Sequence, residues 1–284
     1  MQIACAFEDI GNPVYVQMVK AIERAAASAG YRLVIHSTNR DQDAELAIVG
    51  NLSHGYVDGL IISPLRPTEK LVAAIAGAPR PIVAIGQLPT GIPVDTVRVD
   101  SGAAAAAVVR HLDDQGCRRI GFINGPADTN PGRRRLDGYR AGISAAGLED
   151  DAQLIESAPN FDFQGGLDAT AKLLARTHVD GLFCATDTLA VGAIKALTNL
   201  GLSVPGDVAV ASIDNTELAD LITPALTSID LMASERATAA TELLLDRLQH
   251  PGAPPQTWTS EPSLVIRQSS VRRPQHPHPR KEQR

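Results

Sequence analysis

The sequence has 284 residues, which is enough for one large domain or for two lobes of about 130 residues each. Hydrophobic residues make up 44% of the chain and charged residues 20%, as in ordinary globular proteins, and no apolar run approaches the roughly 18 residues that a membrane-spanning helix needs. The net charge of −6 makes the chain a poor ligand for nucleic-acid phosphates, so the composition excludes both a basic DNA-binding domain and a membrane protein.

The first half alternates short apolar runs with segments of helical periodicity. It begins without the basic segment of a secretory signal, and three scattered cysteines cannot form a disulfide framework, so we expect a cytoplasmic protein without membrane contact. The pattern predicts strands at 3–7, 32–37, 60–63, 82–85 and 96–99, and helices at 14–29, 41–52 and 68–76. Strands as apolar as these are typical of a parallel sheet that is covered on both faces.

The same alternation starts again in the second half. The pattern predicts helices at 102–112, 133–146, 163–175, 188–200 and 233–249, strands at 119–123, 181–185, 208–213 and 226–229, and a final strand pair around 258 and 264–266. The segment 57–63 recurs from Val179, at an offset of 122 residues. The first strands of the two halves are offset by 117 residues. Two similar offsets in matching places indicate two copies of one lobe.

We therefore predict an α/β fold with two doubly wound parallel-sheet lobes joined by a multi-stranded hinge. The elements after residue 213 exceed a second lobe of matching size, which indicates that the chain crosses back to the first lobe. The predicted first lobe comprises residues 1–100 plus about 231–255, and the second comprises 101–230 plus about 256–270. Residues 271–284 are predicted to be a disordered basic tail, because five Lys/Arg and one acid from Arg272 onward give it +4 and leave −10 for the body.

Polar side chains and the scarce aromatic residues follow the predicted strands. In open α/β sheets ligands bind beyond the carboxyl ends of the strands, so we expect a binding cleft where the two lobes face each other. Carboxylates, amides and arginine can each make two hydrogen bonds to hydroxyls or to a ligand carboxylate, and aromatic rings can stack on the apolar face of a ring. The residues at these positions are Glu8, Asp9, Asn12, Tyr15, Ser63, Gly86, Gln87, Gly125, Asp128, Arg133, Phe161, Asp187, Asp214 and Asn215.

Each of these residues also has a purely structural alternative. Asp187 and Asp214 could be helix N-caps, Arg133 could pair with Asp137 on the same helix, and Tyr15 could belong to the core. Motifs for nucleophilic catalysis, zinc-dependent hydrolysis, phosphate binding and thiol redox chemistry are missing from the sequence. We therefore expect no catalytic residue, no metal site and no cofactor, although an enzyme that uses Asp187 or Asp214 as a base remains an alternative.

Several segments together point to a known family. The first predicted strand is followed by Asp9-Ile10-Gly11-Asn12-Pro13-Val14-Tyr15. Further segments of the same kind lie at 57–64, 116–122, 133–142, 204–208, 214–215, 224–229 and 264–270. From about residue 3 to 270, the chain resembles the effector-binding core of the lactose/galactose repressor (LacI/GalR) family, which has the periplasmic-binding-protein-like type I fold. The last segment fits the repressor branch better than the periplasmic sugar-binding branch.

The resemblance implies a homodimeric, effector-sensing core of a transcription regulator, with a small polar, sugar-like effector between its lobes. It implies ligand contacts at Asn12, Tyr15, Ser63, Arg133, Phe161, Asp187 and Asp214. Gly86-Gln87 stand where the family often has Asp-Arg, Thr186 where Asn is usual, and Leu231 where Gln is common. These departures suggest a ligand that is less polar than the usual monosaccharide or differently shaped.

Repressors of this family carry a helix-turn-helix headpiece before the first strand. Since Met1 lies two residues before the first predicted strand, we expect contact with DNA only through an N-terminal domain outside this sequence, and a sensor that has lost DNA binding is the alternative. The alternative function is a solute-binding protein of a sugar uptake system. The missing signal peptide and the repressor-like final segment count against that alternative.

Overall fold

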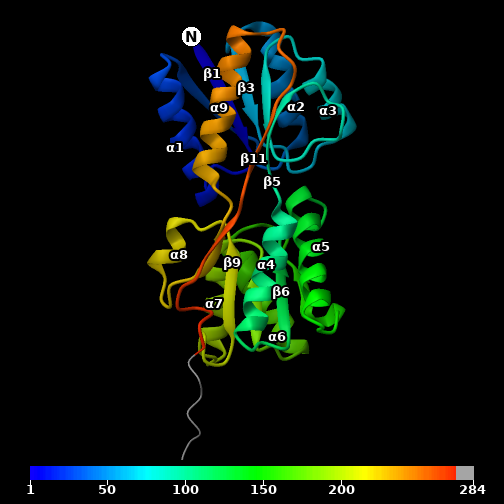
Figure 1. The fold of residues 1–284 in the computed structure, drawn as a ribbon, viewed down its shortest axis with the longest axis vertical. Helices are drawn as coiled ribbons and strands as arrows, with labels where there is room; N and C mark the ends of the chain where they lie inside the picture. Colours follow the sequence, from blue (N-terminus) through cyan, green and yellow to red (C-terminus); the bar gives the residue numbers. More distant parts are fainter. Residues whose placement is uncertain (273–284) are drawn as a thin grey trace, which may run out of the picture.

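Two α/β lobes lie one above the other along the long axis of the molecule in the computed structural model, which describes residues 1–272 (Figure 1). The predicted basic tail lies outside the described residues from position 273 onward. Within residues 1–272, none of the helices combines the length and the apolar character needed to span a bilayer.

Each lobe is built around a 6-stranded sheet, and the two sheets have matching strand orders. The first sheet contains, in spatial order, β11 (Thr257–Ser260), β5 (Asp95–Val99), β4 (Ile82–Ile85), β3 (Gly59–Ile62), β1 (Gln2–Phe7) and β2 (Arg32–Ser37). The second contains β12 (Ser263–Val265), β10 (Thr227–Asp230), β9 (Ala209–Ile213), β8 (Gly181–Cys184), β6 (Ile120–Asn124) and β7 (Ile155–Ser157). The predicted repeat corresponds to this symmetry, because β1 pairs with β3 in the same way as β6 pairs with β8.

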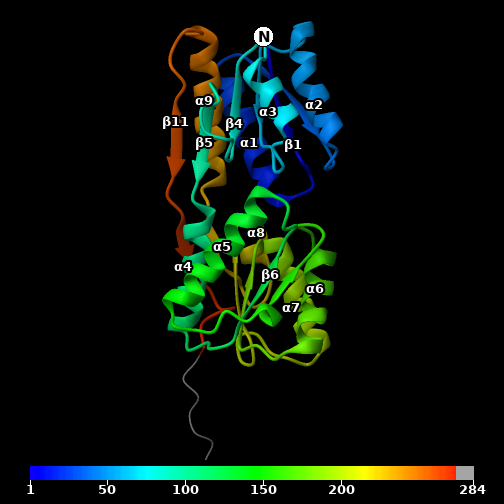
Figure 2. The same ribbon diagram turned by 90° about the vertical axis from the view of Figure 1, so that its right-hand side faces the viewer.

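Helices cover both faces of each sheet (Figures 1 and 2). The first lobe has α1 (Pro13–Ser28), α2 (Gln42–Gly50), α3 (Glu69–Ala76) and α9 (Ala233–Gln249), with a 3-10 turn at Asn51–His54. The second has α4 (Ser101–Asp114), α5 (Asn130–Ala145), α6 (Phe163–Arg176), α7 (Asp187–Asn199) and α8 (Glu217–Leu221), with a 3-10 turn at Ala152–Leu154. Sequence analysis missed α8 and β7, which have 5 and 3 residues and are too short for their periodicity to be recognised.

The burial of β1 explains why its sequence is apolar at every position after the first residue. Alternate residues of a strand point to opposite faces of the sheet. Ile3, Cys5 and Phe7 belong to the core beneath α1 and α9, whereas Ala4 and Ala6 belong to the core beneath α2 and α3. Both faces therefore exclude water, as predicted for a covered parallel sheet.

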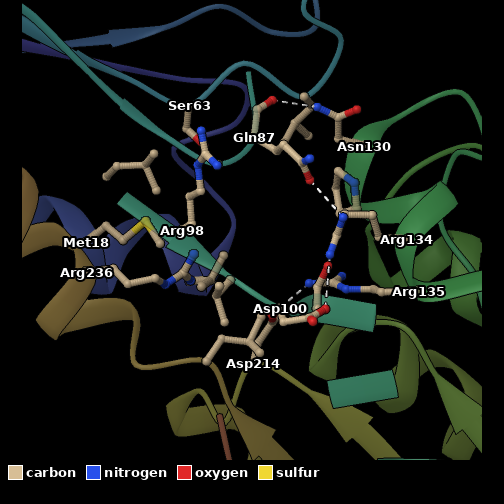
Figure 3. A pocket seen from close by; sticks show the side chains of 18 of the residues that line it. Met18, Ser63, Gln87, Arg98, Asp100, Asn130, Arg134, Arg135, Asp214 and Arg236 are labelled. Carbon is tan, nitrogen blue, oxygen red and sulfur yellow. Dashed lines mark hydrogen bonds and ion pairs between the residues drawn. The ribbon is translucent and has the colours of Figure 1, made fainter. Parts of the chain in front are cut away.

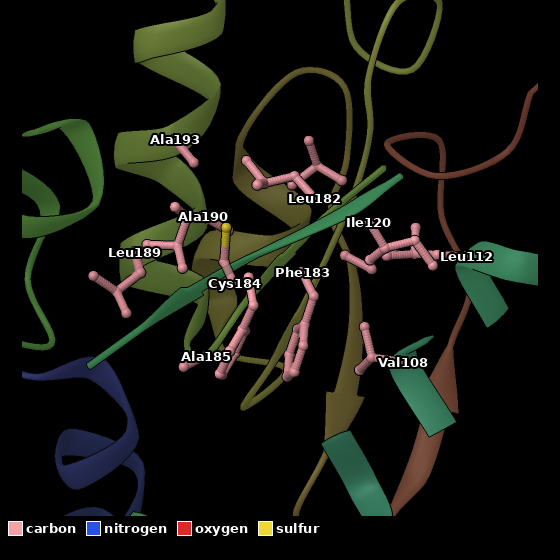
Figure 4. Packing of buried hydrophobic residues seen from close by; sticks show 14 of the residues in the cluster. Val108, Leu112, Ile120, Leu182, Phe183, Cys184, Ala185, Leu189, Ala190 and Ala193 are labelled. Carbon is pink, nitrogen blue, oxygen red and sulfur yellow. The ribbon is translucent and has the colours of Figure 1, made fainter. Parts of the chain in front are cut away.

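The second lobe has one continuous core around β6, β8 and β9. Figure 4 shows Cys184 beside Ala190 of α7, and Phe183 directed toward Val108 of α4. Small residues let the covering helices approach one another closely, since a Cβ atom on Gly138 of α5 would lie 2.1 Å from the carbonyl oxygen of Gly102 on α4.

Three segments cross between the lobes and form the predicted multi-stranded hinge. They connect β5 to α4, β10 to α9 and β11 to β12. Sequence analysis assigned residues from about 256 onward to the second lobe, but β11 pairs in parallel with β5 of the first sheet (Figure 2). Only β12 joins the second sheet, antiparallel to β10. Only two residues, Glu261 and Pro262, separate β11 from β12, which is the length of a tight hairpin loop, yet the chain continues across the hinge.

Candidate functional site

A cavity of about 340 Å³ lies where the carboxyl ends of the two parallel sheets face each other (Figure 3). A smaller cavity of about 60 Å³ adjoins it. The two cavities share Val14, Tyr15, Leu65, Pro131, Arg135 and Asp214, which come from both lobes. The predicted inter-lobe cleft is therefore present, and its volume lies near the lower end of about 300–1,000 Å³ that is usual for small-molecule sites.

Five of the seven predicted ligand contacts line these cavities. Asn12 and Phe161 line the smaller cavity, and Ser63 lines the larger one. Tyr15 and Asp214 border both. The carbonyl Oδ1 of Asn12 serves as the N-cap of α1, where it accepts from the backbone N–H of Val14, so the amide nitrogen of this side chain is left as a donor for a ligand.

Arg133 does not lie in the cleft, contrary to the prediction. It is exposed on the far side of α5 and donates to the Asp128 carbonyl and to Asn130 Oδ1, both at 2.7 Å. Its neighbour Arg135, which is 6% exposed, lines both cavities instead. Two residues along a helix correspond to a rotation of about 200°, so only one of these two arginines can face the cleft.

Asp187 is fully buried in the second lobe and lines neither cavity. Its carboxylate accepts hydrogen bonds from Ser212 Oγ and Ser228 Oγ at 2.6 Å each. It also accepts from the backbone N–H and the Oγ1 of Thr216 at 2.6 and 2.9 Å. The expected ligand contact at Asp187 therefore does not hold, because these bonds occupy the carboxylate. Asp187 is a positioning residue for the loop after β9, which carries Asp214.

Asp214 is the buried acid of the cleft. It is 5% exposed, has a φ of 118°, and lies with Oδ1 3.5 Å from a terminal guanidinium nitrogen of Arg135. Burial raises the pKa of Asp214 to about 7, an effect that the positive charge of Arg135 opposes. The N-cap alternatives for Asp187 and Asp214 do not hold, because Thr186 caps α7 and Thr216 precedes α8. No described residue donates a hydrogen bond to the carboxylate of Asp214, so it can accept from ligand hydroxyls.

Two aromatic rings form walls of the smaller cavity. Tyr15 is 9% exposed and stacks on Phe7 with ring centroids 4.9 Å apart, so it belongs to the core as well as to the cavity lining. The guanidinium of Arg135 lies 5.9 Å from the ring centroid of Phe161. The same ring lies against Gly125, where a Cβ atom would be 2.0 Å from Phe161 Cε1. Position 125 must therefore lack a side chain for the ring to occupy this place.

Sequence reasoning missed three further arginines, Arg98, Arg134 and Arg236, which line the larger cavity (Figure 3). Arg98 interrupts the otherwise apolar end of β5. Arg236 lies on the buried stripe of α9 beside Ala233 and Ala237. A charged residue on a buried strand or stripe is unusual, and this is the signal that could have found two of them.

Hydrogen bonds across the cavity join the two lobes. Arg134 donates to Gln87 Oε1 at 2.8 Å and to Asp100 Oδ1 at 3.1 Å. Asn130 Nδ2 donates to the Gln87 carbonyl at 3.0 Å. Residue 87, one of the departures from the family pattern, therefore holds α5 against the first lobe. Leu231, another departure, presents an apolar side chain to the cavity.

An ion pair joins the lobes beside the cleft. Arg66 Nε and Nη2 donate to the two carboxylate oxygens of Asp128 at 2.6 and 3.1 Å. Arg66 also donates to Glu8 Oε1 at 3.2 Å, and the backbone N–H of Asn130 donates to the Leu65 carbonyl at 2.8 Å. The contacts of Arg66 with Asp128 and of Asn130 with Leu65 join the two lobes, so opening of the cleft must break them, whereas Arg66 and Glu8 both belong to the first lobe.

Comparisons with known proteins decide the family. A family model described as "Periplasmic binding protein-like domain" matches residues 109–270. The ribose operon repressor of Escherichia coli (strain K12) is 32% identical over 263 residues, which cover 91% of this chain and 79% of the repressor. The chain belongs to the LacI/GalR family.

Solved structures of LacI-type regulators have the same fold. The complex of the transcriptional regulator CelR with cellobiose matches with a TM-score of 0.86 and 28% identity, over 94% of this chain and 84% of that one. A putative LacI-family regulator from Sanguibacter keddieii DSM 10542 matches with a TM-score of 0.83 and 29% identity, over 95% and 98% of the two chains. The two lobes form the effector-sensing domain of a LacI-type transcriptional regulator. The alternative of a solute-binding protein is not favoured, since these relatives are regulators.

Proposed function

We propose that this LacI-type core binds a small, sugar-like effector in the cavity between its lobes. The observation that carries the proposal is that buried polar side chains line the cavity with unused hydrogen-bonding capacity. The Asp214 carboxylate, although 3.5 Å from Arg135, accepts no hydrogen bond from a described residue, and neither Arg135 nor Arg236 donates one through its side chain. A buried polar group is costly unless it forms hydrogen bonds, and a ligand with several hydroxyls would supply the missing partners.

Two relatives support a sugar-like ligand. One is named as the ribose operon repressor, and the other was solved as a complex with cellobiose. The volume of about 340 Å³ suits a ligand of monosaccharide size. Tyr15, which stacks on Phe7, and Phe161 line the smaller cavity and offer apolar faces of the kind on which a sugar ring packs.

Effector binding would act through the relative position of the lobes. A ligand that contacts Ser63 on one lobe and Arg135 on the other stabilises the conformation in which the lobes touch. It can shift that equilibrium only by its differential affinity for the two conformations. Because residues 1–271 carry a net charge of −10, we propose that the lobes transmit this signal and do not themselves bind DNA phosphates.

We also propose a homodimer that acts in the cytoplasm, without enzymatic activity, metal or cofactor. The relatives are transcriptional regulators, and the first lobe exposes Ile35 and Tyr56, with 46% and 76% of their surfaces open to solvent. Exposed large apolar side chains are candidates for burial between subunits. Sedimentation equilibrium at micromolar concentration should give twice the mass of the chain, and a monomer would contradict the dimer.

A thermal-shift screen with a matched pair of variants tests the proposed site. An effector raises Tm because it binds only the folded protein. At a ligand concentration of 100 times Kd, this binding stabilises the fold by about 2.7 kcal/mol. The shift should persist in Arg133→Ala, which changes an exposed residue of α5, and should disappear in Arg135→Ala, which changes the cavity. Equal responses of the two variants would contradict the assignment of the cleft.

A further inference from the structure

The larger cavity contains two arginines that form no ion pair with a carboxylate of the described residues. Arg98 reaches it from β5 and Arg236 from α9, and Figure 3 shows both side chains directed inward from the first lobe. Among the described residues, neither guanidinium forms an ion pair, and the Nε atom of each is buried without a hydrogen-bond partner. The terminal guanidinium nitrogens of both side chains also form no hydrogen bond within the described residues, and these are the donors that can reach a ligand in the cavity.

Arg236 is the more unusual of the two. It is 7% exposed, and burial lowers its pKa to about 10, so it still carries a positive charge at neutral pH. Burial of an unpaired charge is strongly unfavourable, and structural arginines in protein interiors are paired. Arg236 also lies in the first turns of α9, where the partial positive charge of the helix end does not compensate it.

The acids of the cavity are already committed to arginines of the second lobe. Asp100 accepts from Arg134 and from two backbone N–H groups at the start of α4. Asp214 lies beside Arg135. The cavity lining contains four arginines and two aspartates, so positive charge is in excess even when both acids are ionised. Arg98 and Arg236 are the two arginines that form no ion pair, although the charge of Asp214 also acts on Arg236.

We propose that the effector is an anion of monosaccharide size, whose carboxylate or phosphate group is held by Arg98 and Arg236. This inference rests on the proposed function and names the ligand class of the same site. Guanidinium groups recognise carboxylate and phosphate oxygens through charge-assisted hydrogen bonds. Ser63, which is 8% exposed and lines the same cavity, supplies a further donor on the first-lobe side. The hydroxyls of the ligand would then face Asp214 and Arg135.

Matched neutral and anionic compounds test the proposal. Tm is measured with D-ribose against D-ribose 5-phosphate, and with D-glucose against D-glucuronate, D-gluconate and D-glucose 6-phosphate, each at 5 mM and equal ionic strength. We expect a sugar acid or a sugar phosphate to raise Tm more than its neutral counterpart. Whether the carboxylates or the phosphates give this rise shows which acidic group the effector carries. Titration calorimetry then gives Kd for that compound.

Variants locate the anion. Arg98→Gln and Arg236→Gln should each weaken binding of the responding anion at least 10-fold, whereas Arg24→Gln, at an exposed position of α1, should leave Kd unchanged. Circular dichroism shows whether each variant is folded, and the half-buried Arg98 provides the test if Arg236→Gln does not fold.

Two outcomes would overturn the proposal. If a neutral sugar raises Tm as much as every charged counterpart, the cleft is a sugar site and the proposed function stands, but the anion site does not. If an anion binds equally well to folded Arg98→Gln and to the wild type, its acidic group is held elsewhere. Failure of the proposed function is distinct, since it would appear as retained binding in Arg135→Ala.

Discussion

Asp187→Ala separates a structural role from a ligand-binding role for this acid. The carboxylate lies beneath the cleft and accepts four hydrogen bonds, two from serine hydroxyls and two from Thr216. These bonds join α7 to β9, β10 and the loop that carries Asp214. Removal of the carboxylate should therefore destabilise the second lobe rather than abolish a direct contact with the effector.

The magnitude follows from the partners that remain. The hydroxyls of Ser212, Ser228 and Thr216 can rotate toward other acceptors, but the buried backbone N–H of Thr216 loses its only partner. An orphaned buried donor costs about 1–3 kcal/mol, and each hydrogen bond to a charged group contributes about 1.5–3 kcal/mol before compensation. We therefore expect a loss of about 3–5 kcal/mol in the free energy of unfolding. With an unfolding entropy of about 2.1 cal/mol/K per residue, Tm should fall by about 5–8 °C.

Asp187→Asn provides the control. An asparagine Oδ1 in place of the oxygen near Thr216 can accept both of its bonds, while Nδ2 can donate to Ser212 Oγ and Ser228 Oγ, which then act as acceptors. Tm of Asp187→Asn should therefore fall by less than half as much. Differential scanning calorimetry measures both variants. A change below about 1 kcal/mol for Asp187→Ala, or an equal loss for the two variants, would refute this reasoning.

Three further predictions concern the cleft. Gly125→Ala should lower the free energy of unfolding by about 1–3 kcal/mol in urea titrations, because the new methyl group displaces Phe161; an unchanged midpoint would contradict the packing. Burial raises the pKa of Asp214 from its ordinary value of 3.8 to about 7, so between these pH values the folded protein retains a proton that the unfolded chain has released. Stability should therefore fall, by up to about 4 kcal/mol, as pH rises from about 4 to 7, and Asp214→Asn should flatten this dependence; parallel curves would contradict it. Asp128→Asn removes the ion pair with Arg66, and since an exposed pair contributes about 0.2–1 kcal/mol, effector affinity should fall by no more than about 5-fold; a larger loss would place Asp128 at the ligand.

The sequence was most informative about the fold where local pattern and tertiary burial agree. Every long helix and every central strand followed from periodicity, because a doubly covered parallel sheet buries its strands on both faces and its helices on one. The last two strands show the limit. A separation of two residues is typical of a hairpin, and only the tertiary pairing of β11 with β5 and of β12 with β10 places the two strands in different sheets.

The cleft was predictable where a side chain directly follows a strand, as Ser63 and Asp214 do. The prediction of Arg133 as a ligand contact was wrong, because the rotational phase of α5 determines which of its consecutive arginines faces the cleft. The buried residues Tyr139 and Ile143 are spaced by four, and the same stripe extends back to Arg135 and not to Arg133. That phase was available in the sequence, and following it would have placed Arg135 in the cleft.

The charge of the cavity alters what the departures from the family pattern imply about the ligand. Gln87 and Leu231 suggested a less polar ligand, yet Arg98 and Arg236 make the cavity more strongly charged. Unpaired charges of this kind are better hydrated when the lobes separate, so the empty closed conformation is disfavoured by the cost of burying Arg236. On the proposed anion site, a ligand that neutralises both arginines removes this cost only in the closed conformation. The same two side chains would then determine both which ligand is bound and how strongly its binding closes the lobes, since a ligand shifts a conformational equilibrium by its difference in affinity for the two states.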